Sequence, residues 1–160
     1  MRSTTPIFGL LRAAALVVLV VALAACSRNG TGVGNVGPGS GPPGSQQEFL
    51  VTVGDRVFFE TDSSALTPTA IATLDKQAVW LNRYRNYRIL IEGHADERGT
   101  REYNIALGAR RASVVVSYLV SKGVDAGRIT SKSFGKERPV AICDDISCWS
   151  QNRRAVTVVQ

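Results

Sequence analysis

Apolar residues recur at helical spacing in two stretches of the chain. The first stripe starts after Thr67 and Pro68, a residue pair typical of a helix N-cap and first turn, and runs to about Tyr84. The second starts after Thr100 and ends near Lys122–Gly123, where the glycine suits a C-cap. The stripes consist of Ile71, Leu74, Ala78 and Leu81, and of Ile105, Ala109, Ala112, Val116 and Leu119. Trp80 falls off the first stripe, so we expect it at the margin of the core or partly exposed.

Four short segments alternate or concentrate apolar residues as strands do. They are Arg56–Phe59, a segment around Ile89 and Ile91, Ile129–Phe134, and Ala155–Val159. Combined with the helices, they give the order β-α-β-α-β-β over residues 49–160. This order predicts an α/β (α+β) fold, a two-layer sandwich with helices on one face of a mixed sheet. The order of the strands within the sheet stays open.

The first 25 residues have the pattern of an export signal. Arg2 and Arg12 accompany an apolar run, Leu10–Ala25, that is short for a membrane span. The run ends in Leu23–Cys26, which resembles a lipobox, so we expect cleavage before Cys26 and lipid attachment to it. A plain signal peptide followed by a chance cysteine is the alternative. Ser27 is consistent with delivery to the outer membrane.

Residues 26–48 follow as a linker dominated by glycine and proline. Such a composition buries little apolar area and predicts a flexible tether. The chain carries a net charge of +6, which falls to +4 when Arg2 and Arg12 are removed with the signal. An exported basic domain fits an anionic cell-wall polymer rather than nucleic acid.

Two cysteines remain once Cys26 is assigned to lipid. Cys143 and Cys148 form an even pair in an oxidising compartment, which indicates a disulfide closing a short loop. A metal site that adds Asp144 and Asp145 is the alternative. It lacks histidines and the usual paired ligand spacing.

The start of the second predicted helix carries the candidate chemistry. Asn104, Leu107 and Arg111 lie at i, i+3 and i+7 and share one helical stripe. The stripe points toward the preceding loop, where Asp96 lies. A carboxylate and a guanidinium held apart match a zwitterion, because the first takes an ammonium and the second clamps a carboxylate. An ordinary salt bridge between Asp96 and Arg111 is the alternative.

These residues also belong to a longer signature. It resembles that of the OmpA-like peptidoglycan-binding domain family, over about residues 49–160, and comprises Gly93–Thr100, Glu102–Ile105, Leu107–Gly108 and Arg110–Ala112. The resemblance implies that Asp96 and Arg111 grip the diaminopimelate residue of the peptidoglycan stem peptide.

The same resemblance implies further contacts and partners. It puts Phe59, Glu60 and Ser64 against the bound stem peptide. The family's acid at this point is commonly aspartate, so the contact made by Glu60 stays open. The most similar members are outer-membrane lipoproteins that work with the Tol system, including its periplasmic propeller protein. No cofactor is implied.

Two other classes of function are alternatives to peptidoglycan binding. A cell-wall hydrolase would have to use His94, Asp96 and Glu97, but His94 is the only histidine and no G-x-S-x-G elbow is present. We expect His94 to end a strand and make a structural hydrogen bond. A purely protein-interaction domain is the third possibility, against which the intact Asp96, Asn104 and Arg111 argue.

Overall fold

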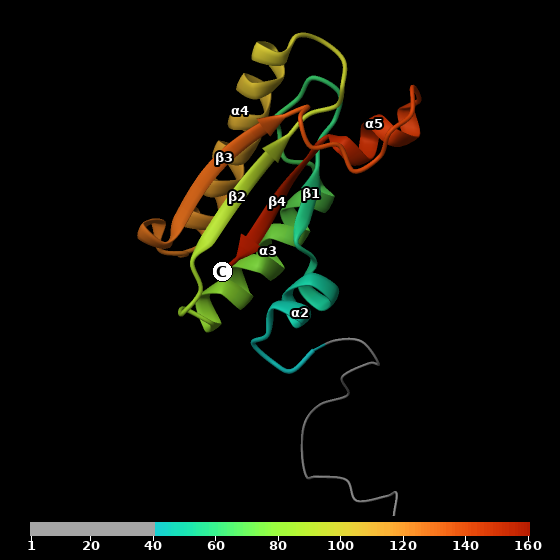
Figure 1. Cartoon of the computed structure of the whole chain (residues 1–160). Helices are drawn as coiled ribbons and strands as arrows, with labels where there is room; N and C mark the ends of the chain where they lie inside the picture. Colours follow the sequence, from blue (N-terminus) through green and yellow to red (C-terminus); the bar gives the residue numbers. More distant parts are fainter. Residues whose placement is uncertain (1–40) are drawn as a thin grey trace, which may run out of the picture. The chain divides into compact units, whose positions relative to one another are not determined.

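The computed structural model describes residues 41–160, all within one compact unit (Figure 1). The signal, Cys26 and most of the predicted linker lie outside the described residues. The helices are α2 (Gln46–Glu48), α3 (Pro68–Arg83), α4 (Arg101–Ser121) and α5 (Ile146–Asn152), with shorter turns η1 (Phe49–Gly54) and η2 (Ala126–Arg128), and the strands are β1 (Arg56–Phe58), β2 (Ile89–His94), β3 (Ile129–Gly135) and β4 (Arg154–Val159). Thr67 and Thr100 cap α3 and α4 through their hydroxyl oxygens, as predicted. No helix within residues 41–160 is long and apolar enough to cross a membrane.

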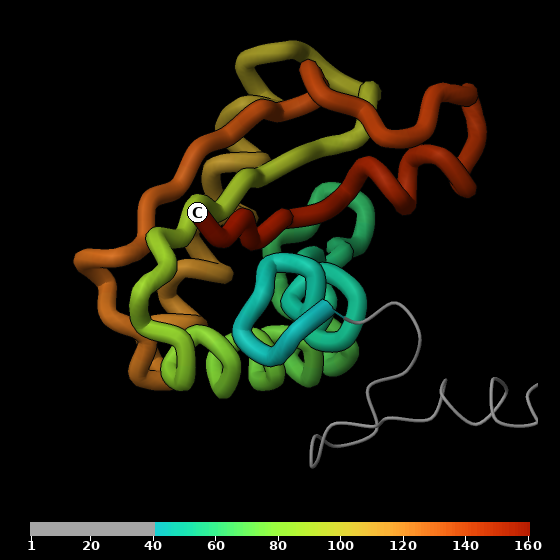
Figure 2. Tube along the Cα trace, turned by 60° about the horizontal axis from the view of Figure 1, so that its bottom comes forward, coloured from blue at the N-terminus to red at the C-terminus, as the bar shows by residue number. Residues whose placement is uncertain are grey.

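The four strands form one mixed sheet in the order β1-β4-β2-β3. β2 pairs with β3 in parallel, whereas β4 is antiparallel to both β1 and β2. Figure 2 shows α3 and α4 on the same side of this sheet. The predicted mixed sheet with helices on one face is therefore confirmed, with α5 inserted between β3 and β4.

The buried face of α4 differs from the predicted apolar stripe. Ala109 is exposed and Val116 is half-buried, while Leu107 and Val115 are buried. The helix is turned because two polar residues, Asn104 and Arg111, also lie on its buried face. The predicted stripe is therefore right at Ala112 and Leu119, which are buried in the core, and wrong at Ala109.

The expected position of Trp80 was also wrong, since its side chain is only 5% exposed. The ring of Phe49 lies 4.9 Å from it, and Trp80 Nε1 donates to Glu48 Oε2 at 2.8 Å. Tyr87 donates its hydroxyl to the Gly44 carbonyl at 2.7 Å. The chain from Gly44 to Gly54 thus forms turns that cover α3, so its contacts with the domain begin inside the segment predicted to be linker.

Two glycines allow α4 to lie directly on β2. A Cβ atom on Gly93 would lie 1.9 Å from the carbonyl oxygen of Gly108, and one on Gly108 would lie 2.5 Å from Ser133 Oγ. Ser133 Oγ in turn donates to the Ile105 carbonyl at 2.7 Å. This close approach brings Arg111, one turn beyond Gly108, within reach of the end of β2.

His94 ends β2, as predicted, but its ring does not make the expected hydrogen bond. The imidazole is 2% exposed and stacks on Phe134 with ring centres 5.6 Å apart. Neither ring nitrogen has a hydrogen-bond partner among the described residues, and the nearest carboxylate oxygen, of Glu92, is 3.6 Å from Nε2. Burial, together with the charges of three arginines, lowers the pKa of His94 to about 4; these are Arg154, Arg138 and Arg56.

We predict a pH dependence of stability from this histidine. Its pKa is lower in the folded chain than the ordinary 6.5 of the unfolded chain, so the unfolded chain binds more protons between pH 6.5 and 4. The free energy of unfolding should therefore fall as pH falls through this window, by up to about 3 kcal/mol. Because His94 is the only histidine, proton NMR can titrate it without assignment. A midpoint near 4 is expected, and a midpoint near 6.5 would contradict the burial argument.

Candidate functional site

A pocket of about 300 Å³ opens where β2 ends and α4 begins. The loop after β1, the loop after β2 and the first turns of α4 contribute its walls. Its lining residues are Thr61, Asp62, Asp96, Arg98, Gly99, Tyr103, Asn104 and Leu107. We call it the Asp96 pocket.

Asp96 is 7% exposed, and its carboxylate accepts several hydrogen bonds. Arg98 Nη2 lies 2.7 Å from Oδ2, while Arg98 Nε and backbone N each lie 3.2 Å from Oδ1. Arg153 Nη1 lies 3.4 Å from Oδ2. Burial would raise the pKa of Asp96, but the side-chain and backbone hydrogen bonds from Arg98 outweigh it and hold the pKa below its ordinary value. Asp96 is therefore ionised at neutral pH.

The loop that carries Asp96 is fixed from two sides. Asn104 Nδ2 donates to the Arg98 carbonyl at 2.7 Å, so the predicted orientation of the Asn104 stripe toward this loop is confirmed. Lys136 Nζ donates to the carbonyls of Glu97 and Gly99 at 3.0 and 2.7 Å. These bonds satisfy loop carbonyls and leave the side chain of Asp96 to face the pocket.

Arg111 is fully buried beneath the pocket rather than in its wall. Its guanidinium donates to three backbone carbonyls, those of Ser63 (Nε, 2.8 Å), His94 (Nη1, 2.9 Å) and Glu60 (Nη2, 3.1 Å). It also lies 5.1 Å over the ring of Phe59. The alternative of an Asp96–Arg111 salt bridge is wrong for this conformation, because the ion pairs of Asp96 are with Arg98 and Arg153.

The charge of Arg111 has no carboxylate partner among residues 41–160. Burial lowers the pKa of its guanidinium to about 10, against the favourable field of Asp96. The group stays charged at neutral pH. Three of its five N–H donors are used, which leaves two for another acceptor.

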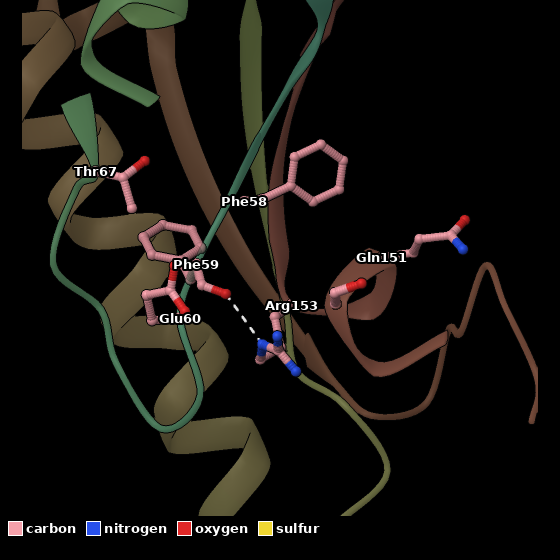
Figure 3. A pocket seen from close by; sticks show the side chains of 7 residues that line it. Phe58, Phe59, Glu60, Thr67, Gln151 and Arg153 are labelled. Carbon is pink, nitrogen blue, oxygen red and sulfur yellow. Dashed lines mark hydrogen bonds between the residues drawn. The ribbon is translucent and has the colours of Figure 1, made fainter. Parts of the chain in front are cut away.

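The three residues predicted from the loop after β1 lie apart from the Asp96 pocket. Phe59 and Glu60 line a second pocket of about 320 Å³, shown in Figure 3. The side chain of Ser64 lines neither pocket, and the neighbouring Ser63 supplies the carbonyl that holds Arg111.

Sequence reasoning missed two residues that meet across the Asp96 pocket. The Tyr103 hydroxyl donates to Asp62 Oδ1, which joins the first turn of α4 to the loop after β1. Asp62 has a φ of 55°, a left-handed conformation that aspartate tolerates better than most residues. A Thr-Asp-Ser-Ser run after a strand is typical of a turn, and this was the available signal.

The segment between β3 and β4 reaches the same loop. Cys143 and Cys148 are joined by a disulfide across a separation of 5 residues. Within α5, Trp149 Nε1 donates to Glu97 Oε1 at 2.8 Å, and the Arg98 guanidinium lies 4.2 Å over the Trp149 ring. The disulfide-bearing segment therefore supports Arg98, the cation that pairs with Asp96.

Comparison with known proteins places these features in a family. The OmpA family matches residues 58–153. A peptidoglycan-associated lipoprotein of Rhizobium meliloti is 60% identical over 148 residues, which cover 89% of this chain and 84% of that protein. A protein of the same name from Haemophilus influenzae is 42% identical, over 86% of this chain and 90% of that one.

Solved structures agree with this relationship. The crystal structure of the peptidoglycan-associated lipoprotein from Burkholderia pseudomallei has a TM-score of 0.66 and 40% identity, covering 69% of this chain and 96% of that one. The C-terminal domain of Helicobacter pylori MotB, at 22% identity and a TM-score of 0.62, covers 66% of this chain and 84% of that one and shares the fold. The chain therefore belongs to the OmpA family and, within it, to the peptidoglycan-associated lipoproteins.

Proposed function

We propose that this protein binds peptidoglycan non-covalently through the diaminopimelate of the stem peptide, in the Asp96 pocket. The observation that carries the proposal is the carboxylate of Asp96, which is nine-tenths buried, ionised and turned into a pocket. The names of the relatives, peptidoglycan-associated lipoproteins, support the same ligand. The side chain of diaminopimelate ends in a centre with both an ammonium and a carboxylate, so it needs an anionic and a cationic contact.

The ammonium would bind at Asp96. In the free protein Arg98 occupies the carboxylate, but its side chain is exposed and rests on Trp149, so it has room to yield. Asp62 adds a second carboxylate to the same pocket, held by Tyr103. An ammonium bound there replaces one cation by another and keeps Asp96 paired, which avoids an uncompensated buried charge.

The carboxylate of the ligand would bind Arg111. This guanidinium is buried with carbonyl partners only, and two N–H donors remain. A carboxylate gives charge-assisted hydrogen bonds that are stronger than those to carbonyls. Because Arg111 is fully covered, the loop that contains Glu60 and Ser63 has to shift outward when the ligand enters.

Binding without catalysis fits this geometry best. The relatives carry names of binding proteins rather than of enzymes. The imidazole of His94 stacks on Phe134 and does not line the Asp96 pocket, so it is out of reach as a general base for a ligand there.

The remaining parts of the chain suit a tether between outer membrane and cell wall. Lipid on Cys26 would hold the protein in the outer membrane, with the domain in the periplasm and the linker between them. We place it in the Tol-Pal system, which acts in envelope integrity and cell division, with the periplasmic propeller protein as partner. The surfaces that bind the partner and peptidoglycan would overlap. The propeller protein and the stem peptide should therefore exclude each other in a binding titration, and simultaneous binding would contradict this.

The central prediction concerns three substitutions. Asp96→Asn and Arg111→Lys should each weaken binding to purified peptidoglycan by about tenfold to over a hundredfold, since charge-assisted hydrogen bonds are worth roughly 1.5–3 kcal/mol. Arg110→Lys is the matched control, because Arg110 is exposed, is turned about 100° around α4 from Arg111 and does not line the Asp96 pocket.

Affinity and unfolding free energy should be measured on the same samples. Arg111→Lys should also lower stability, because an ammonium cannot reproduce the fork that reaches three carbonyls. Asp96→Asn is the cleaner probe of the ligand contact. Wild-type affinity of folded Asp96→Asn would defeat the assignment.

The anchor is tested at Cys26. Cys26→Ala should abolish fatty-acid labelling and release the protein from the outer-membrane fraction, because no other residue in the Leu23–Cys26 box carries a thiol. Continued labelling with unchanged fractionation would exclude this attachment. Cys143→Ala with Cys148→Ala is the matched control and should leave labelling intact.

A further inference from the structure

The pocket in Figure 3, which we call the Phe58 pocket, lies next to the Asp96 pocket. Its lining residues are Phe58, Phe59, Glu60, Thr67, Ser150, Gln151 and Arg153. Arg153 donates through Nε to the Phe59 carbonyl at 3.0 Å and lies 3.4 Å from Asp96 Oδ2 through Nη1. Glu60 lines one pocket and Thr61 the other, so a ligand in the Asp96 pocket has the Phe58 pocket as its neighbour.

The Phe58 pocket combines an open aromatic face with neutral polar groups. Phe58 is 47% exposed and projects from β1 toward the side on which Gln151 of α5 lies, whereas Phe59 projects the opposite way into the core (Figure 3). Gln151 Nε2 donates to the Ser147 carbonyl at 3.0 Å, which leaves Oε1 without a partner in the described chain. Hydroxyls come from Thr67 and Ser150.

The charges of the pocket cancel. Glu60 contributes one carboxylate at its exposed rim and Arg153 one guanidinium at its buried floor. A strongly anionic ligand would meet Glu60, and a strongly cationic one would meet Arg153. The pocket thus favours a neutral molecule with one apolar face and several hydroxyl or amide groups. A sugar ring presents this combination, because its axial C–H bonds form an apolar face that packs on an aromatic ring while its hydroxyls bond to polar side chains.

We propose that the Phe58 pocket binds an N-acetylated sugar of the glycan strand from which the bound stem peptide hangs. The acetamide supplies an N–H for Gln151 Oε1. The hydroxyls of the sugar bond to Glu60, Thr67 and Ser150, while the sugar ring packs on Phe58. This inference rests on the proposed function, since it takes the Asp96 pocket as the site of the stem peptide.

The test compares two ligands on the full chain purified in detergent. One is the diaminopimelate-containing tripeptide, and the other is the same tripeptide on its N-acetylglucosamine–N-acetylmuramic acid disaccharide. Calorimetry should give a Kd about tenfold lower for the disaccharide form. Phe58→Ala and Gln151→Ala should remove that difference and leave the Kd of the bare tripeptide unchanged.

Ile142→Ala is the matched control. The substitution truncates an exposed apolar side chain between β3 and α5 that lines neither pocket. The difference in Kd between the two ligands should therefore persist. Equal affinity of the wild-type protein for both ligands would overturn the inference, as would a Phe58→Ala effect of the same size on both.

The failure of the two proposals can be told apart. If the tripeptide binds and the sugar adds nothing, only the glycan site is wrong. If the tripeptide does not bind, the proposed function fails, and the free disaccharide then decides this inference by NMR. Perturbation of Phe58 and Gln151 signals supports the glycan site, and unperturbed signals overturn it.

Discussion

The buried guanidinium of Arg111 is the interaction on which the site depends. From α4 it reaches the loop after β1 at Glu60 and Ser63 and the end of β2 at His94. Burying a charge without a counter-charge costs several kcal/mol, which three carbonyl hydrogen bonds offset only in part. The contact of Gly93 with Gly108 makes this reach possible by bringing the helix onto the strand.

An excess of positive charge follows from this arrangement. Arg98 and Arg153 bond to the buried carboxylate of Asp96. Arg111 lies close enough for Asp96 to raise its pKa, against the burial that lowers it to about 10. The floor of the pocket is therefore short of negative charge. A ligand carboxylate would correct that shortage, and a ligand ammonium would take the place of the exposed Arg98 side chain. On the proposed function, this balance would favour a zwitterion over either charge alone.

The features predicted correctly from the sequence are those that depend on neighbouring residues. Caps, helices and strands appear within a few residues of their predicted bounds, because hydroxyl caps and apolar spacing act locally. The sheet order was out of reach, since β4 enters between β1 and β2 through pairings remote in the sequence.

In the candidate site too, the local features were predictable and the tertiary ones were not. Asp96, Asn104 and Leu107 meet in one pocket, as their spacing suggested, whereas Asp62 joins them through a left-handed turn that spacing does not reveal. The loop that covers Arg111 is held there by tertiary contacts, which residue spacing does not predict.

A structure of the protein with the diaminopimelate tripeptide tests the central claim most directly. We expect the ligand ammonium within hydrogen-bond distance of Asp96, the adjoining carboxylate on Arg111, and the bond from Arg111 to Ser63 or Glu60 released. A tripeptide bound elsewhere, with all three carbonyl bonds of Arg111 intact, would contradict it.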